Sequence, residues 1–592
     1  MKKRAAAIQQ PKQPVIAQAS EWLTLETLLY AGVLIGAAVL RLVNLGVAPL
    51  STNEAGQALA AFNGAVAPAG SSPLLYSLNQ ILCGLFGSSV GDAGVRLGSA
   101  LIGTVLVMLP VLWRKRIGRI GALVASIALA ISPTMVFASR SLNGAIVVAA
   151  CALGALGFGL RYIESRRSMY LIGFTISIGL ALLSGAGIVT LAIVISLGLW
   201  ISYRWSGSTE VEQLRSAAQE LRGQPQSWRR AVLWGGAVFG LVATVGLTHV
   251  AALGSVADLA SAWLAAWRAI ETTNAVRLFQ ILVVYEPLIL LIGLAGLVMV
   301  LLRTDATSIL LAVWGLGAML ILLLQPGRQP IDLVLVLTPL ALLAGMLVER
   351  LVESLQRHGA WALEGTLWLI AVPLVGYLVL EAGITTVRPS AGGGSMSPLL
   401  SFFLTAVLLS LIIGVIFVLA IGFRAVLRAA SAALLIVLAL ISLGGAWNAT
   451  QVRAGDPHEL LAGSDVTTHD VRDLLVGLEA ASTRLTGNRD TLALSVELPQ
   501  TDLALQWYLR EFKRTQYASD PTSQTPPQAI IMPMGATPSA KPGEYVGAPF
   551  NIRSTWNAGA MSDAALVRWW FYREADLPVP SETVVLWVKT AK

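Results

Sequence analysis

Long apolar runs, separated by short polar stretches, dominate residues 23–447 of the chain. A helix needs roughly 17–25 residues, mostly apolar, to cross a bilayer. About thirteen runs approach or reach this length, so we predict a polytopic α-helical membrane protein with about thirteen transmembrane helices. The predicted spans lie near 23–44, 93–113, 119–138, 144–162, 169–184, 186–202, 230–253, 279–302, 307–324, 331–350, 361–386, 399–422 and 430–447.

Basic residues recur in every second loop between the predicted spans. Cytoplasmic loops of membrane proteins carry an excess of Lys and Arg, so these loops are predicted to face the cytoplasm together with the N-terminus. An odd number of spans then places the C-terminal region outside. The basic groups are Lys2–Arg4, Arg114–Arg116, Arg161–Arg167, Arg204–Arg230, Arg303, Arg350–Arg357 and Arg424–Arg428.

Three polar regions divide the chain further. Residues 1–22 are polar and basic and are predicted to form a disordered cytoplasmic tail. Residues 45–92, within a transmembrane bundle that covers 23–447, make a long first outer loop with amphipathic stretches at 53–67 and 73–87. Residues 448–592 are long enough for a domain, and helix-like and strand-like segments alternate there. That alternation predicts a small extracytoplasmic α/β domain.

The composition agrees with a membrane protein. The chain is 55% hydrophobic and 12% charged, with a mean hydropathy of +0.71, whereas soluble domains carry about 25% charged residues. The net charge of +8 follows the loops between spans, so it indicates topology and predicts no nucleic-acid partner. Cys83 and Cys151 lie in different apolar segments, and neither a disulfide framework nor a metal site follows from them.

Several segments, taken in chain order, resemble the GT-C membrane glycosyltransferases, and within them the protein-mannosyltransferase and aminoarabinose-transferase group. The C-terminal Trp-Tyr-Leu-Arg element is similar to one in the flippase-activity-associated branch of the same superfamily. The segments that carry the resemblance are Arg41–Gly46, Asn53–Ala55, Pro73–Tyr76, Phe86–Gly87, Arg96–Gly103, Ser132–Arg140, Gly327–Pro330, Leu337–Gly345 and Trp507–Phe512.

This resemblance implies a fold, a location and a reaction. Members of the superfamily take a sugar from a polyprenyl-phosphate carrier and transfer it to an acceptor on the outer face of the membrane. The chain is accordingly expected to be a multi-pass plasma (inner) membrane protein of GT-C type. Its expected partners are a polyprenyl-phosphate sugar donor, membrane lipids and a protein or glycan acceptor, with a partner subunit in a membrane complex as a further expectation.

The resemblance also assigns catalytic positions to the first outer loop. Relatives open this loop with a pair of acids, of which the first is generally the base; the corresponding residues here are Asn53 and Glu54. An asparagine cannot accept a proton near neutral pH, which leaves Glu54 as base or ion ligand. The alternative role of Glu54 is structural, because Ser51-Thr-Asn-Glu54 is a capping box that closes a helix start.

A lipid phosphate requires cations, and arginines stand near the predicted outer ends of several spans. Guanidinium groups suit phosphate oxygens, although a single arginine at a span end is also a common interfacial anchor. No metal-ligand spacing occurs, so no cofactor is predicted, and a loosely held divalent cation is left open. The predicted lipid-phosphate-binding residues are Arg41, Arg96, Arg140, Arg328 and Tyr76.

Two hypotheses follow. The first is a membrane glycosyltransferase that uses a polyprenyl-phosphate-linked donor. The second is a catalytically degenerate relative that serves as a scaffold or accessory subunit, because Asn143 and Ser184-Gly185 also stand where relatives carry charged residues. Asp92, just before a predicted span, is expected to be its N-cap.

Overall fold

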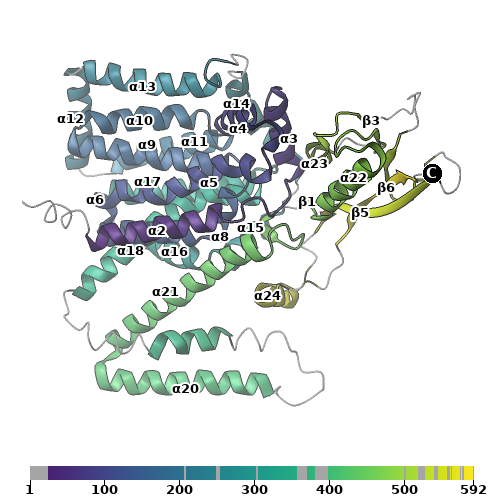
Figure 1. Cartoon of the computed structure of the whole chain (residues 1–592). Helices are drawn as coiled ribbons and strands as arrows, with labels where there is room; N and C mark the ends of the chain where they lie inside the picture. Colours follow the sequence, from purple (N-terminus) through teal and green to yellow (C-terminus); the bar gives the residue numbers. More distant parts are fainter. Residues whose placement is uncertain are drawn as a thin grey trace, which may run out of the picture.

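The computed structural model shows a bundle of long helices with a small sheet domain at one end (Figure 1). It describes residues 24–590 except 206–207, 224, 249–253, 272, 302–304, 357–369, 381–397, 463–464, 499–501, 518–526, 539–543, 557–560, 562, 574 and 576–578. The predicted tail at 1–22 and most of the predicted span at 361–386 lie outside the described residues.

The first half of the bundle contains the two amphipathic loop helices and the helices around them. Their bounds are α2 Leu25–Leu42, α3 Thr52–Asn63, α4 Pro73–Phe86, η1 Gly87–Ser89, α5 Asp92–Met108, η2 Leu109–Trp113, α6 Arg114–Ile117, α7 Arg119–Ile131, α8 Pro133–Ser139, α9 Ala145–Ser165, α10 Ser168–Ala181, α11 Gly187–Trp205, α12 Ser208–Gly223 and α13 Pro225–Ala243.

The second half contains shorter helices near the sheet domain and two long helices, α20 and α21. Helix α21 runs from α20 towards the sheet-domain end of the bundle (Figure 1). The bounds are α14 Gly254–Ala266, α15 Ala275–Tyr285, α16 Pro287–Leu301, α17 Ala306–Leu324, η4 Pro330–Leu333, α18 Val334–Gln356, α20 Pro398–Ile421, α21 Phe423–Trp447, η5 Asn448–Val452 and η6 Leu460–Ala462.

Within the described residues, seven helices are long and apolar enough to cross a membrane, or up to nine if each of two bent helix pairs counts as one span. This makes the chain a multi-pass membrane protein. The expected number of about thirteen stays a prediction, since several apolar helices, such as α10, are shorter than a full span.

Two predicted spans are broken. The segment at 119–138 bends by 63° between α7 and α8, and the segment at 279–302 bends by 100° between α15 and α16. Pro133 and Pro287 open the second helix of each pair, because proline suits the first turn of a helix but interrupts the one before it. Each of the predicted spans 119–138 and 279–302 is therefore a pair of helices joined at a bend.

The two breaks meet inside the bundle. The Glu286 carboxylate accepts hydrogen bonds from Ser132 Oγ (2.6 Å) and Thr134 N (2.9 Å) at the start of α8. Glu286 is only 1% exposed. A buried polar group needs hydrogen-bond partners, and here Glu286 Oε1 accepts from one hydroxyl and from one amide that the break between α7 and α8 leaves open.

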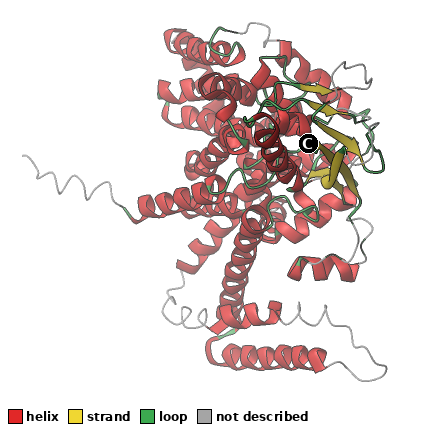
Figure 2. Cartoon of the chain, turned by 45° about the vertical axis from the view of Figure 1, so that its right-hand side comes forward, coloured by secondary structure: helices red, strands yellow, loops and turns green. Residues whose placement is uncertain are grey.

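Within the described residues, the sheet domain has six strands in the order β1-β5-β6-β4-β2-β3. The strands are drawn in yellow in Figure 2. Strand β2 is parallel to β3 and β4, and the remaining pairs are antiparallel. A mixed sheet combined with helices agrees with the predicted α/β domain. The bounds are β1 Asp465–Thr467, α22 Asp470–Thr486, β2 Leu494–Val496, α23 Leu503–Leu509, β3 Thr515–Tyr517, β4 Ala529–Pro533, β5 Tyr545–Thr555, α24 Asp563–Tyr572 and β6 Ser581–Lys589.

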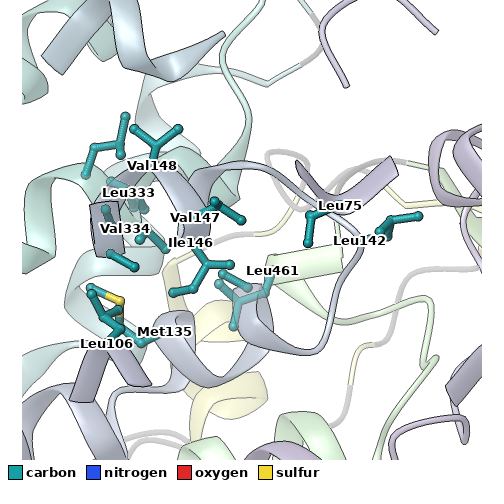
Figure 3. Close-up of a cluster of buried hydrophobic side chains, with 14 of the residues drawn as sticks. Leu75, Leu106, Met135, Leu142, Ile146, Val147, Val148, Leu333, Val334 and Leu461 are labelled. Carbon is teal, nitrogen blue, oxygen red and sulfur yellow. The ribbon is translucent and has the colours of Figure 1, made fainter. Parts of the chain in front are cut away.

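Apolar packing continues from the bundle into the segment that leads to the sheet. Leu461 from η6 is 1% exposed and belongs to the same cluster of buried apolar side chains as Leu106, Met135 and Ile146 (Figure 3). Burying such a side chain contributes about 1.5–3 kcal/mol. The sheet domain is therefore packed onto the bundle end and shapes the space between them.

Candidate active site

A cavity of about 660 Å³ lies where the ends of several bundle helices meet the segment before the sheet. We call it the interface cavity. Polar side chains with three carboxylates line it, together with apolar residues of α17 and α18. The lining residues used below are Ser51, Asn53, Glu54, Arg96, Arg140, Leu142, Asn143, Gln329, Asp332, Glu459 and Thr467.

Helix α3 presents the predicted catalytic pair to this cavity. Its capping box is present: Glu54 N donates to Ser51 Oγ (3.4 Å), and Ser51 N donates to Glu54 Oε2 (3.0 Å). Asn53, one position earlier, is exposed and lines the cavity. The structural role expected for Glu54 is thus realised, whereas the catalytic role stays a prediction.

Glu54 is also paired with a cation. Arg96 of α5 donates from Nε to Glu54 Oε1 (3.0 Å) and from Nη2 to Oε2 (2.7 Å), and Leu142 N donates to Oε1 (2.7 Å). Burial would raise the pKa of Glu54, but the Arg96 charge and the hydrogen bonds from Arg96, Ser51 and Leu142 hold it below its usual value. A carboxylate stabilised in its charged form is a weak base.

Arg140 and Asn143 stand in the turn between α8 and α9. The Arg140 guanidinium donates to backbone carbonyls where α2 ends, with Nη1 2.6 Å from Val43 O and Nη2 2.7 Å from Asn44 O. Asn143 Oδ1 accepts from Ala145 N (2.7 Å) and so starts α9. A larger residue would not fit at position 144, because a Cβ on Gly144 would lie 2.5 Å from Ser184 O.

The other predicted phosphate ligands are not among the described residues that line this cavity. Arg41 is fully buried and donates to Ser139 Oγ (3.2 Å) and to carbonyls of α7. Arg328 Nη1 is 2.9 Å from Glu271 Oε1. Tyr76 donates its hydroxyl to Ala65 O (2.6 Å). Of the five residues, the structure brings Arg96 and Arg140 to the cavity with Asn53 and Glu54.

Sequence reasoning missed two carboxylates of the cavity wall. Asp332 lies in η4, at the start of the predicted span 331–350, where one acid is outweighed by the apolar residues around it. Glu459 precedes η6 and lies in a polar segment without a motif. For Asp332, the signal was available: Gln-Pro-Ile-Asp is a proline-led helix start with a carboxylate three residues after its cap.

Glu459 belongs to a buried polar group between the bundle and the sheet domain. Tyr285 at the end of α15 donates its hydroxyl to the Glu459 carboxylate, and Arg573 Nη1 donates to the same hydroxyl (3.0 Å). Burial raises the pKa of Glu459 to about 7, against the opposing effect of the Arg573 charge. The group ties α15 to the end of α24.

Asp92 does not cap α5, contrary to the expectation; Gly91 is the N-cap. Its carboxylate instead accepts from Trp507 Nε1 (2.9 Å), Tyr508 Oη (2.7 Å) and Arg472 Nη2 (2.5 Å) of the sheet domain. Arg510 stacks on the Trp507 ring at 3.8 Å. The Trp-Tyr-Leu-Arg element thus docks on the end of the first loop, together with Arg472 of α22.

Comparisons with known proteins bear on the fold. A family model described as dolichyl-phosphate-mannose-protein mannosyltransferase matches residues 70–211. The apo crystal structure of ArnT from Cupriavidus metallidurans matches with a TM-score of 0.50 and 17% identity, over 83% of this chain and 85% of that chain. The same protein bound to undecaprenyl phosphate matches with a TM-score of 0.49 and 16% identity, over 85% and 87% of the two chains. No curated protein sequence matches significantly.

A third structure is an archaeal oligosaccharyltransferase, AglB from Archaeoglobus fulgidus, in complex with an inhibitory peptide and a dolichol-phosphate. It matches with a TM-score of 0.41 and 13% identity, over 82% of this chain and 63% of that chain. At 17% identity and a TM-score of 0.50, the likeness to the apo ArnT structure concerns the fold alone. The chemistry of the cavity has to be argued from its own residues.

Proposed function

From the GT-C membrane glycosyltransferase fold of this chain, we propose that it transfers a sugar from a polyprenyl-phosphate-linked donor to a protein or glycan acceptor on the outer face of the membrane. The interface cavity carries the proposal, because it combines carboxylates with neutral amides at the end of a membrane bundle. Amide and carboxylate oxygens bind sugar hydroxyls, and pockets of about 300–1,000 Å³ suit small ligands.

The proposed orientation places the N-terminus in the cytoplasm and the sheet domain outside the plasma (inner) membrane. The alternating basic loops support this orientation. Arg96 and Arg140 are proposed to make the cavity electropositive near the lipid phosphate, with Arg41, Arg328 and Tyr76 proposed to support that region. We propose no tightly bound cofactor. Loss of transfer when a chelator is added to the assay would indicate that the reaction uses a loosely held divalent cation.

The test uses purified protein in liposomes with a panel of synthetic polyprenyl-phosphate sugars and a crude acceptor fraction. Release of free polyprenyl phosphate, measured by mass spectrometry, reports transfer. Asn53→Trp fills the cavity from an exposed position and is expected to lower release by about 10²-fold, because small displacements of a bound substrate cost that much. Val66→Trp, at a 72% exposed position outside the cavity lining, is the matched control.

Absence of release from every donor by the wild type, with folded protein, would overturn the glycosyltransferase proposal. The alternative is then a scaffold or accessory subunit, and one observation favours it: Arg96, Ser51 and Leu142 fully engage Glu54. A scaffold should bring a stoichiometric membrane partner when it is purified from native membranes in mild detergent.

A further inference from the structure

We propose that Asp332 is the general base of the transfer reaction and removes the proton from the acceptor hydroxyl. This inference rests on the proposed function and names the residue that performs its central step. It starts from a comparison of the three carboxylates that line the interface cavity: Glu54, Asp332 and Glu459.

Glu54 and Glu459 are already committed to protein contacts. Glu54 is 7% exposed and binds Arg96, Ser51 and the Leu142 amide. Glu459 is 4% exposed and accepts from the Tyr285 hydroxyl. A base has to reach the substrate proton within about 2.6–3.2 Å. Both oxygens of Glu54 are hydrogen-bonded, and Glu459 also interacts with backbone amides of η6 and with the Arg573 charge.

Asp332 is half-buried, and the part of the chain that the structure describes gives its carboxylate one hydrogen bond. Gln329 N donates to Asp332 Oδ2 (3.0 Å), which leaves Oδ1 for a substrate. Within the described residues, no cation forms an ion pair with Asp332. Proximity of a cation lowers the basicity of a carboxylate, so Asp332 avoids the effect that weakens Glu54.

The position of Asp332 is fixed by its surroundings. Gln329 and Asp332 form a reciprocal capping box around η4, and Pro330 sets the backbone of its first turn. Gln329 Oε1 also accepts from Asn143 Nδ2 (3.4 Å) in the α8–α9 turn. A base held by a short rigid helix and linked to the neighbouring wall keeps its geometry while substrates exchange.

The placement also accounts for Asn53 and Asn143. Both amides line the cavity and neither can accept a proton near neutral pH. The base is supplied instead from η4. In the step, the acceptor oxygen forms a bond to the anomeric carbon of the sugar while its proton passes to an oxygen of Asp332. The bond from that carbon to the phosphate oxygen breaks, and the polyprenyl phosphate leaves with the electron pair.

The experiment compares Asp332→Asn, Asp332→Glu and Asp305→Asn in the liposome assay. Asparagine keeps the side-chain oxygen that accepts from Gln329 N, so the fold is retained. Asp305 is the matched control: it caps α17, accepting from Ser308 N (3.1 Å), and lies outside the cavity lining. Removal of a general base costs about 10²–10⁴-fold in rate. We expect that loss in kcat for Asp332→Asn with KM nearly unchanged, partial recovery for Asp332→Glu, and wild-type rates for Asp305→Asn.

The pH profile separates a base from a structural residue. Wild-type kcat/KM should fall at low pH as the base is protonated, and this acid limb should be absent from the residual activity of Asp332→Asn. If Asp332→Asn kept the wild-type rate and an unchanged acid limb, the assignment of Asp332 as the base would be overturned, whereas the proposed function would stand. A wild type inactive on every donor would overturn the proposed function and the base with it. A gain in rate for Asn53→Asp above about tenfold, which is a free-energy change of about 1.4 kcal/mol, would assign the base to α3 instead.

Discussion

Three buried arginines of this molecule hold turns and helix ends of the backbone. Arg41, Arg96 and Arg140 each donate to main-chain carbonyls, and Arg96 adds the paired bonds to Glu54. A guanidinium has five donors in a fixed fork, so one arginine can donate hydrogen bonds to several carbonyls of a helix end or turn. These three arginines, which were predicted to bind phosphate, thus have a structural role that spacing in the sequence does not reveal.

Replacement of Glu54 by glutamine should destabilise the protein. The change leaves Arg96 buried without a charged partner, which costs about 3–5 kcal/mol. Because the folded pKa of Glu54 is below its unfolded value of about 4.3, the stabilisation is complete above that pH and is lost as pH falls through the folded pKa.

Unfolding of detergent-solubilised wild type and Glu54→Gln, followed against pH, measures this effect. The difference in unfolding free energy between them should shrink as pH drops below about 4. Equal stability at neutral pH would show that the buried pair contributes nothing net.

At the scale of elements, hydropathy located most helices but not their breaks. A hydropathy window averages across Ser132-Pro133 and across Glu286-Pro287, so it reports one span where two helices meet at an angle. The amphipathic loop helices at 53–67 and 73–87 were predictable because their apolar positions repeat at helical spacing, and α3 and α4 confirm them. The contact between the two breaks depends on tertiary packing that no local pattern encodes.

Glu286→Ala should weaken the bundle at this contact, whereas Glu286→Gln should be milder. Alanine leaves Thr134 N and Ser132 Oγ buried without their acceptor, and each unsatisfied group costs about 1–3 kcal/mol. Both groups donate to the same Glu286 oxygen, Oε1, and glutamine keeps a side-chain oxygen at that position. Thermal unfolding of both variants in detergent checks the order, and a glutamine variant as unstable as alanine would indicate that the charge itself is required.

At the scale of the whole molecule, the docking of the sheet domain completes the cavity. Asp92 binds Trp507, Tyr508 and Arg472, and the domain in turn brings Thr467 to the cavity wall. The alternation of helix and strand predicted an α/β domain but not where it attaches. One of its main partners in the bundle is Asp92, which resembles a helix cap in the sequence. Asp332 escaped prediction for a similar reason, since it lies within an apolar run.

Asp92→Ala should loosen the sheet domain while the bundle stays folded. The substitution removes the acceptor of three hydrogen bonds, including a charged pair with Arg472, and its cost is about 3–5 kcal/mol. Limited proteolysis should cut faster near residues 453–469, and transfer should fall with it. Asp473→Ala, at an exposed position in the same domain, is the control, and equal proteolysis of the two variants would contradict this docking role.

The contact between Asp92 and Trp507 joins residues 415 positions apart. Ribosomes add roughly 5–20 residues per second, so about 20–80 s of synthesis separate the two partners. Until the C-terminal segment has been made, the helices already synthesised lack one wall of the interface cavity. The interface cavity therefore stays incomplete until the C-terminal sheet has formed. A chain that terminates before the sheet has helices of the bundle but lacks the finished site.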